Sequence, residues 1–211
     1  MTEARPTASG LRGRGFADLL LFGVTLAELA LLVVLTPTFT LTDWIYVSQN
    51  LLVLGITLTR RPPERQDRSL ASGAAVVIAY TYTYAQVACL RWVPGEVGWS
   101  SGGLVLVTLG ACLSLASLLS LGRWFGVRPA LRGLATKGPY RAVRHPMYLS
   151  DILFRIGFVI GHFHWMTSIL FVVSSACYVL RARYEETFLG QQTEYREYMN
   201  RVKYRFIPFI Y

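Results

Sequence analysis

The sequence predicts an all-α fold, a polytopic bundle of about five to six transmembrane segments with a cytoplasmic, cofactor-binding C-terminal part. Of the 211 residues, 53% are hydrophobic and only 16% are charged, whereas soluble domains carry about 25% charged residues. The apolar residues form blocks close to the roughly 20 residues that cross a bilayer as a helix. We therefore expect residues 1–211 to form a single integral membrane domain.

The formal net charge of +9 is distributed in a way that favours a membrane protein over a nucleic-acid binder. Basic residues gather in four segments: Arg5–Arg14, Arg60–Arg68, Arg123–Arg144 and Arg181–Arg183. The loops between these segments contain only Arg91. Because basic loops stay on the cytoplasmic side, the four segments and both termini are predicted to be cytoplasmic. Membrane lipids, and no nucleic acid, are the expected partners, and the scarcity of lysine points to a GC-rich prokaryote and its inner membrane.

The N-terminal half is predicted to hold four transmembrane helices within residues 17–121, after a mobile tail at 1–16. Pro37 separates the first two helices, because proline breaks a helix interior. The four spans run from about Ala17 to Leu35, Asp43 to Leu58, Leu70 to Trp92 and Gly102 to Leu121.

Polar residues inside these spans predict which faces lie inward. A carboxylate within a membrane is costly unless it faces the bundle or water, so Glu28 is expected to point inward. Gln49 and Asn50 suit hydrogen bonds between helices, and the many Gly, Ala and Ser residues of the fourth span allow close helix contacts.

Residues 122–211 are predicted to form the cofactor-binding part, with a helical hairpin and an interfacial C-terminal tail. The hairpin arms run from Tyr148 to Gly161 and from Met166 to Leu180, and the first arm is short for a full span. The second arm is expected to continue as a polar helix to about Leu189, followed by another helix at about Gln192–Arg201. In the first arm, Asp151 and Arg155 are four residues apart and can therefore pair.

The stretch TKGPYRAVRHPMY, residues 136–148, concentrates the unusual residues of the chain. Gly138-Pro139 predicts a sharp turn. Proline after His145 disfavours helical geometry at the histidine, so a helix is predicted to begin at Pro146 or Met147. The free N–H groups of that helix end suit a carboxylate or phosphate.

Acidic residues are predicted to lie across from this stretch. Arg181 and Glu185 are four residues apart on one helix face, and Glu186 lies beside them. A pocket with an anion-binding end and an acidic end suits a zwitterionic ligand. Two simpler interpretations stay open, namely headgroup anchoring by the basic residues and an ordinary helix salt bridge between Arg181 and Glu185.

The motif GPYRAVRHPMY, followed some forty residues later by RARYEE, resembles the isoprenylcysteine carboxyl methyltransferase family and the related phospholipid methyltransferases. The resemblance covers about Leu121 to Tyr211. It implies a membrane enzyme that binds S-adenosylmethionine without a Rossmann domain, and the chain has no GxGxxG motif after a strand. The family pattern departs at Lys203-Tyr204, where a proline is more usual, and we expect only a local change in the tail.

The resemblance also implies the roles of individual residues. Arg181 would bind the methyl acceptor and, with Glu185, form the catalytic pair, with no metal. The cofactor would be contacted by Leu134, Ala135, Tyr140, Arg144, His145, Pro146, Met147, Tyr148, Glu185 and Glu186. The reaction would be an in-line displacement at the sulfonium methyl, in which positioning and desolvation supply much of the rate.

The favoured function is therefore methyl transfer to a lipophilic acceptor, foremost the carboxylate of an isoprenylcysteine-like or other prenylated small molecule. Phospholipid amines and small thiols are alternative acceptors. Two other classes stay open, namely an NADPH-dependent reductase of the sterol type and a non-catalytic scaffold or transporter. Only Glu28, Asp151 and Arg155 favour transport. The HxH pair His162 and His164 is interpreted as part of a loop and not as a metal site. The sequence leaves the oligomeric state open.

Overall fold

The protein is described by a computed structural model that covers residues 16–35, 39, 41–59, 65–66, 73–74, 77, 85, 100–126, 130–131, 133–161, 163–208 and 210. These residues are mostly helical. The α-helices are α1 (Phe16–Leu35), α2 (Leu41–Thr59), α4 (Ser101–Leu121), α5 (Pro146–Gly161), α6 (Trp165–Leu189) and α7 (Thr193–Arg201). Short elements are the 3-10 helices η2 (Gly122–Trp124) and η3 (Gly138–Arg141) and the strands β1 (Arg65–Gln66) and β2 (Ala130–Leu131).

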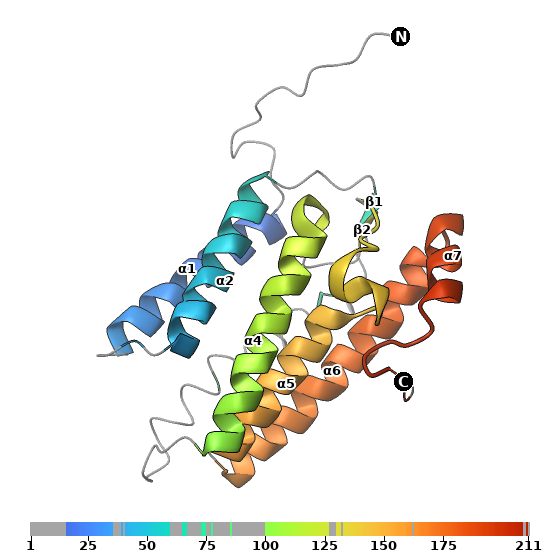
Figure 1. The fold of residues 1–211 in the computed structure, drawn as a ribbon. Coiled ribbons are helices and arrows are strands. Elements are labelled where there is room, and N and C mark those ends of the chain that lie inside the picture. The colour runs from blue at the N-terminus through green and yellow to red at the C-terminus, as the bar shows by residue number, and fades with distance from the viewer. Residues whose placement is uncertain are drawn as a thin grey trace.

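The long helices form one layered bundle in which α4, α5 and α6 run side by side (Figure 1). Helix α2 packs against α4 on one flank, with α1 packed against α2, and α7 lies at one end beside the end of α6. The helical class predicted from the sequence is thus confirmed within the described residues. Only β1 and β2 pair as strands there, and each has two residues.

Most predicted helix limits agree with the structure to within two residues. Helix α5 begins at Pro146, as the proline predicted, and α6 runs unbroken from the apolar arm into the polar extension up to Leu189. Among the described residues, two helical stretches are long and apolar enough to cross a membrane, Ser101–Trp124 and Trp165–Leu189. The predicted third span and the N-terminal tail fall almost wholly outside the described residues.

Small residues determine how closely α4 and α5 pack. A Cβ atom added at Gly103 would lie 2.7 Å from the carbonyl oxygen of Gly157, and one added at Gly157 would lie 2.6 Å from that of Gly103. One added at Gly110 would lie 2.8 Å from the carbonyl oxygen of Ser150. The two backbones therefore touch along a seam, the glycine seam, as the composition of the fourth span predicted.

A hydrophobic core joins the N-terminal helices to this pair. Leu21, Ile56, Leu118 and Phe125 are buried together, and Met147 at the start of α5 packs against them. The start of α5 is therefore supported by α1, α2 and α4 at once.

The inward orientation predicted for the polar residues of α1 and α2 agrees with their burial. Glu28 is half-buried on the helix face that also carries the buried Leu21 and Thr25. Asn50 is buried in α2. These side chains lie inside the helix assembly, where a polar group needs a partner.

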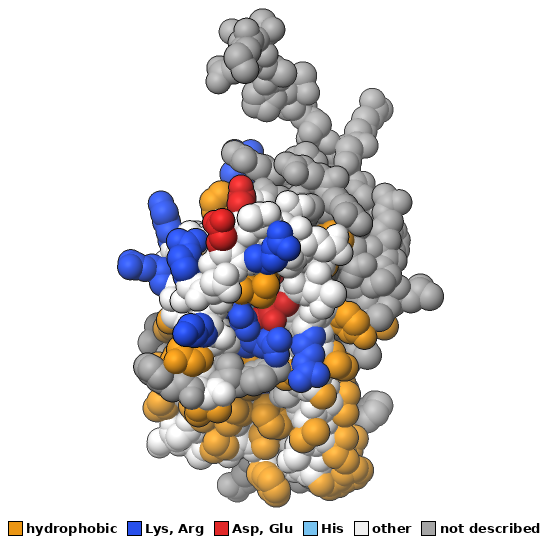
Figure 2. All heavy atoms as spheres, turned by 90° about the vertical axis from the view of Figure 1, so that its right-hand side faces the viewer, with side chains coloured by type: hydrophobic (Ala, Val, Ile, Leu, Met, Phe, Trp, Pro, Cys, Tyr) orange, Lys and Arg blue, Asp and Glu red, His pale blue; other side chains and the backbone are white. Residues whose placement is uncertain are grey.

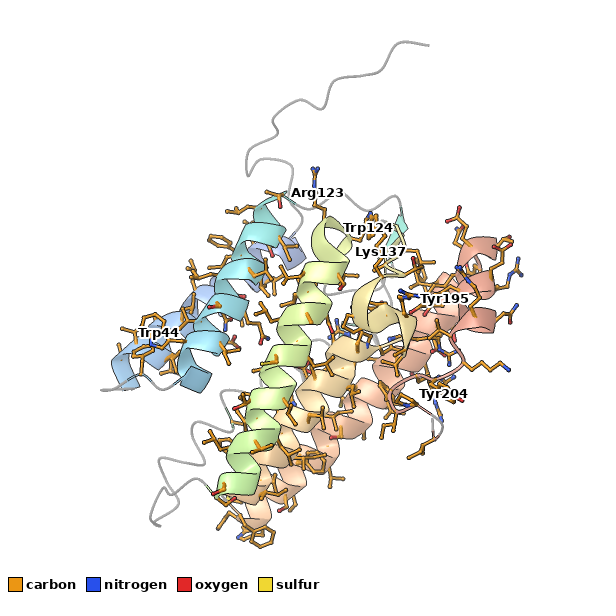
Figure 3. All side chains as sticks on the ribbon, viewed as in Figure 1. Trp44, Arg123, Trp124, Lys137, Tyr195 and Tyr204 are labelled. Atoms are coloured by element: carbon orange, nitrogen blue, oxygen red, sulfur yellow. The ribbon has the colours of Figure 1, made fainter. Side chains whose placement is uncertain are left out.

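Several basic segments meet at one end of the bundle, which we call the polar end. The antiparallel pairing of Arg65 with Leu131 places the segment after α2 beside the segment after α4. Arg123 also donates a hydrogen bond of 2.9 Å from Nε to the carbonyl of Thr59 at the end of α2. Arg123, Lys137 and Tyr195 all lie at this end (Figure 3). On the face shown in Figure 2, charged side chains lie over the upper and middle part of the coloured surface, and hydrophobic ones predominate below them.

Candidate functional site

The stretch before α5 forms a tight turn against α4 and α7. Gly138 has a φ of 57°, and a Cβ atom there would collide with the hydroxyl of Ser120 on α4, so a larger residue would be both strained and crowded. The turn buries Tyr140, whose carbonyl accepts a hydrogen bond of 2.8 Å from the Tyr198 hydroxyl on α7. The turn is thus fixed from two sides.

His145 lies at the junction between this turn and α5. Its carbonyl accepts a hydrogen bond of 3.1 Å from the amide of Leu149, which is the first turn of the helix. Pro146 follows as the first helical residue and is fully buried. The structure therefore presents His145 just before a helix N-terminus, as the His-Pro pair predicted.

The C-terminal tail packs directly onto this junction. The amides of Arg144 and His145 donate hydrogen bonds of 2.9 Å each to the carbonyls of Tyr204 and Arg205. The ring of Phe206 lies 5.9 Å from the His145 ring, centroid to centroid. The sequence predicted only an interfacial tail, so this contribution of the tail to the site was missed.

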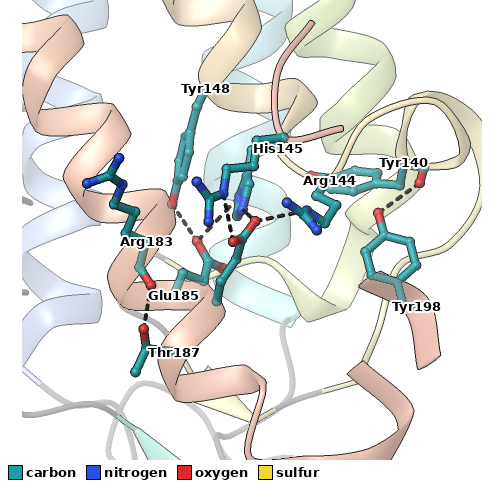
Figure 4. A network of polar contacts seen from close by, with 10 residues as sticks. Tyr140, Arg144, His145, Tyr148, Arg183, Glu185, Thr187 and Tyr198 are labelled. Carbon is teal, nitrogen blue, oxygen red and sulfur yellow. Dashed lines mark hydrogen bonds and ion pairs between the residues drawn. The ribbon is translucent and has the colours of Figure 1, made fainter. Parts of the chain in front are cut away.

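Glu186 is the centre of a buried charged cluster, which we call the Glu186 cluster. Figure 4 shows two of its members, Arg144 and His145, within the network of polar contacts. Its Oε1 lies 3.1 Å from His145 Nε2 and 2.9 Å from Arg144 Nε, and its Oε2 accepts a hydrogen bond of 2.8 Å from Arg205 Nε. The Arg144 contact is an ion pair rather than a hydrogen bond, because the Nε–H does not point at the carboxylate. Both carboxylate oxygens are engaged, and the side chain is only 8% exposed.

Glu185 has different surroundings although it is the adjacent residue. Its Oε2 accepts a hydrogen bond of 2.7 Å from the Tyr148 hydroxyl, and its side chain is 27% exposed. The rings of His145 and Tyr148 are parallel within 3° and lie 5.3 Å apart. Glu185 therefore anchors the Tyr148 ring of this stacked pair through its hydroxyl and keeps part of its own carboxylate accessible.

Arg181 completes this arrangement one helical turn before Glu185. Its guanidinium carbon lies 5.2 Å from the centre of the Tyr148 ring, in a cation–π contact. The side chain is 9% exposed. Tyr148 thus contacts both members of the predicted catalytic pair.

The remaining predicted cofactor residues line the same end of the molecule. Leu134 packs against a buried cluster of Tyr195, Tyr198 and Val202 from α7 and the tail, and Ala135 is buried. Burial raises the pKa of Tyr195 and of Tyr198 far above the ordinary value for tyrosine, so both hydroxyls stay protonated at any working pH.

His164 has a structural role outside the site. Its Nδ1 accepts a hydrogen bond of 3.2 Å from the amide of Met166, and its own amide donates to the Thr167 hydroxyl, which makes it the N-cap of α6. This agrees with the prediction of a loop at the HxH pair. His162 lies outside the described residues.

Two comparisons with known proteins match the part of the chain that builds this site. Residues 99–196 match the family model described as phospholipid methyltransferase. The chain is also 29% identical, over 119 residues, to Protein-S-isoprenylcysteine O-methyltransferase A of Arabidopsis thaliana. The aligned region covers 53% of this chain and 60% of that protein. The resemblance predicted from the paired motifs is therefore confirmed, and the chain spans about three fifths of the length of this curated relative.

Proposed function

We propose that this chain is an integral membrane methyltransferase that uses S-adenosylmethionine and acts on a lipophilic acceptor, foremost an isoprenylcysteine-like carboxylate. One observation carries the proposal: Tyr148 joins Glu185 and Arg181 beside His145 at the N-terminus of α5. This arrangement falls inside the residues that match the phospholipid methyltransferase model. The name of the curated relative supports the choice of acceptor.

The residues at the site fit a zwitterionic cofactor. The partly exposed carboxylate of Glu185 is suited to an ammonium group or to ribose hydroxyls. The first amides of α5 are suited to a carboxylate, because they point out of the helix end and carry its positive partial charge. The parallel rings of His145 and Tyr148 supply an apolar surface between these two ends.

We assign the Glu186 cluster a supporting role. Its carboxylate is shared among His145, Arg144 and Arg205, so it holds the junction before α5 in place and neutralises positive charge there. Tail and turn are thereby fixed to α6 by one buried anion. The family pattern implies that Glu186 contacts the cofactor. In this arrangement, Glu186 would instead influence the cofactor indirectly, through His145 and Arg144.

The bound cofactor supplies a methyl group already activated on a sulfonium sulfur. The chain has to align the acceptor with that methyl and exclude water. Arg181 is suited to orient a carboxylate acceptor through two parallel N–H···O contacts. A carboxylate is already deprotonated at neutral pH, so this acceptor needs no general base.

We further propose that the bundle has five to six membrane segments and that its polar end faces the cytoplasm of a prokaryotic cell. The meeting of the segments after α2 and after α4 at this end supports the proposal, because basic loops are retained on the cytoplasmic side. The exposed hydrophobic side chains on α1, α2, α4 and α6 would then contact lipid.

A binding and turnover experiment tests the proposed function. Calorimetry on the detergent-purified chain should detect binding of S-adenosylhomocysteine and no binding of NADPH. Labelled S-adenosylmethionine should then transfer its methyl group to prenylcysteines in preference to phosphatidylethanolamine or small thiols. Binding of NADPH alone would overturn the methyltransferase proposal, and preference for phosphatidylethanolamine would overturn the proposed acceptor.

A further inference from the structure

A second polar cluster lies between α5 and α6, deeper in the bundle than the site. We call it the inner cluster, and it consists of Asp151, Arg155 and Tyr178. Arg155 Nη2 donates a hydrogen bond of 3.0 Å to the Tyr178 hydroxyl, and its guanidinium carbon lies 4.9 Å from the centre of the Tyr178 ring. The Tyr178 hydroxyl is in turn hydrogen-bonded to the carboxylate of Asp151.

The phenol of Tyr178 is therefore held at its hydroxyl by two charged groups from the opposite helix. Arg155 and Tyr178 are both buried. Because one group donates to the hydroxyl and the other accepts from it, the ring has a defined position and direction. An apolar residue at 178 could fill the space but would not fix this direction.

The inner cluster touches the site through the ring of Tyr178. That ring packs on the ring of Tyr148, with centroids 5.3 Å apart and planes inclined by 39°. Tyr148 in turn donates to Glu185 and carries Arg181 on its ring face. A continuous set of contacts thus runs from Asp151 and Arg155 through Tyr178 and Tyr148 to the two residues assigned to catalysis.

Placing a half-buried aspartate and a buried arginine between helices is costly, and apolar residues of similar size are often neutral or better for stability. Stability alone therefore gives a weak reason for this cluster. From the sequence, Asp151 and Arg155 also favoured a role in transport. A transport role does not explain why both side chains converge on one phenol that packs against Tyr148.

We infer that Tyr178, oriented by Asp151 and Arg155, is a positioning residue that sets the ring of Tyr148 and thereby aligns Arg181 and Glu185. The inference rests on the proposed function, since it assigns those two residues to the reaction. The inner cluster acts on alignment, so its loss is expected to lower kcat more than cofactor affinity. Misplacement of reacting groups by about 1 Å can cost on the order of 100-fold in rate.

The first test is Tyr178→Phe, which keeps the ring and removes the hydroxyl that both charged groups contact. We expect kcat to fall roughly tenfold, while the melting temperature drops by no more than about 4 °C and S-adenosylhomocysteine affinity stays within about threefold. Tyr184→Phe is the matched control, because Tyr184 lies on the same helix and is 43% exposed. It should leave all three quantities unchanged.

The second test separates positioning from stability. The triple variant Asp151→Leu, Arg155→Met, Tyr178→Phe replaces the inner cluster by apolar side chains of comparable size. We expect its melting temperature to match or exceed that of the wild type, while kcat remains at the level of Tyr178→Phe. Recovery of full kcat in the triple variant, or unchanged kcat in Tyr178→Phe, would overturn the inference and leave the proposed function intact. A wild-type chain that neither binds S-adenosylhomocysteine nor transfers methyl groups would overturn both.

Discussion

Glu185 and Glu186 are neighbours on α6 and both lie near His145, but their surroundings differ in burial and in the number of cationic partners. Successive helix residues point about 100° apart, so adjacent side chains face different partners. Glu186 is closed in by His145, Arg144 and Arg205. Glu185 accepts a hydrogen bond from the Tyr148 hydroxyl, lies 4.0 Å from His145 Nδ1 and is 27% exposed. A saturated buried carboxylate suits structural support, whereas a partly open one suits ligand contact.

The largest effect is expected for Glu186→Ala, which leaves two guanidinium groups and a histidine without their shared anion. Removing one member of a buried charge cluster costs about 3–5 kcal/mol. Thermal melting should show this loss, and S-adenosylhomocysteine binding should fail with it. Arg205→Gln is the milder variant of the same cluster, because Arg205 is 26% exposed and its loss should cost much less stability. A Glu186→Ala chain that melts like the wild type would contradict the supporting role.

Arg181→Ala is expected to have the next largest effect, and this variant should lower kcat without lowering cofactor affinity. Loss of a group that stabilises charge at the reacting centre costs on the order of 100-fold in kcat. Calorimetry should find cofactor affinity nearly unchanged, because Arg181 is assigned to the methyl acceptor and not to the cofactor. If affinity and kcat fell by the same factor, Arg181 would belong to the cofactor site instead. Arg183→Ala is the matched control, since that side chain is exposed on the same helix.

Glu185→Ala should weaken binding with little effect on folding. One charge-assisted hydrogen bond contributes about 1.5–3 kcal/mol, which corresponds to at least about a tenfold loss of S-adenosylhomocysteine affinity. Calorimetry measures this loss, and circular dichroism melting measures the stability. Glu185→Gln keeps an acceptor for the Tyr148 hydroxyl, so it should retain the alignment of the rings but lose the charge. Equal destabilisation by Glu185→Ala and Glu186→Ala would show that the two carboxylates do not have the different roles assigned to them.

The smallest effect concerns Tyr198, which ties α7 to the turn before α5. Burial raises the pKa of Tyr198 above that of the unfolded chain, so the folded state holds this proton more tightly. The related stability is complete below about pH 10 and declines as the pH rises further. Tyr198→Phe should cost about 1 kcal/mol at neutral pH and should make the alkaline decline shallower. A melting series from neutral to alkaline pH would check both, and an unchanged alkaline slope would contradict this account.

The sequence predicted the local features of the fold and of the site. Apolar runs predicted α4, α5 and α6, and the His-Pro pair predicted the start of α5 at Pro146. The spacing of Arg181 and Glu185 predicted a shared helix face, and Tyr148 contacts both of them in the structure. These features depend on periodicity and on backbone restrictions of single residues.

Contacts between distant segments could not be predicted in the same way. Arg205 and Phe206 reach the site because the tail runs back along residues 144–145, and no pattern in the tail indicates its path. Asp151 and Arg155 were recognised as a pair, but their convergence on Tyr178 depends on the register between α5 and α6. That register follows from packing of side chains across the helices, which a single sequence does not specify.

The glycine seam between α4 and α5 has a consequence for how an acceptor reaches the site. At Gly103, Gly110 and Gly157 the two backbones are so close that not even one added carbon atom fits between them. The hydrocarbon chain of the proposed lipophilic acceptor therefore has no passage between these two helices along the seam. A lipid arriving sideways has to enter through another gap in the bundle, and cross-linking α4 to α5 along the seam should leave its entry unaffected.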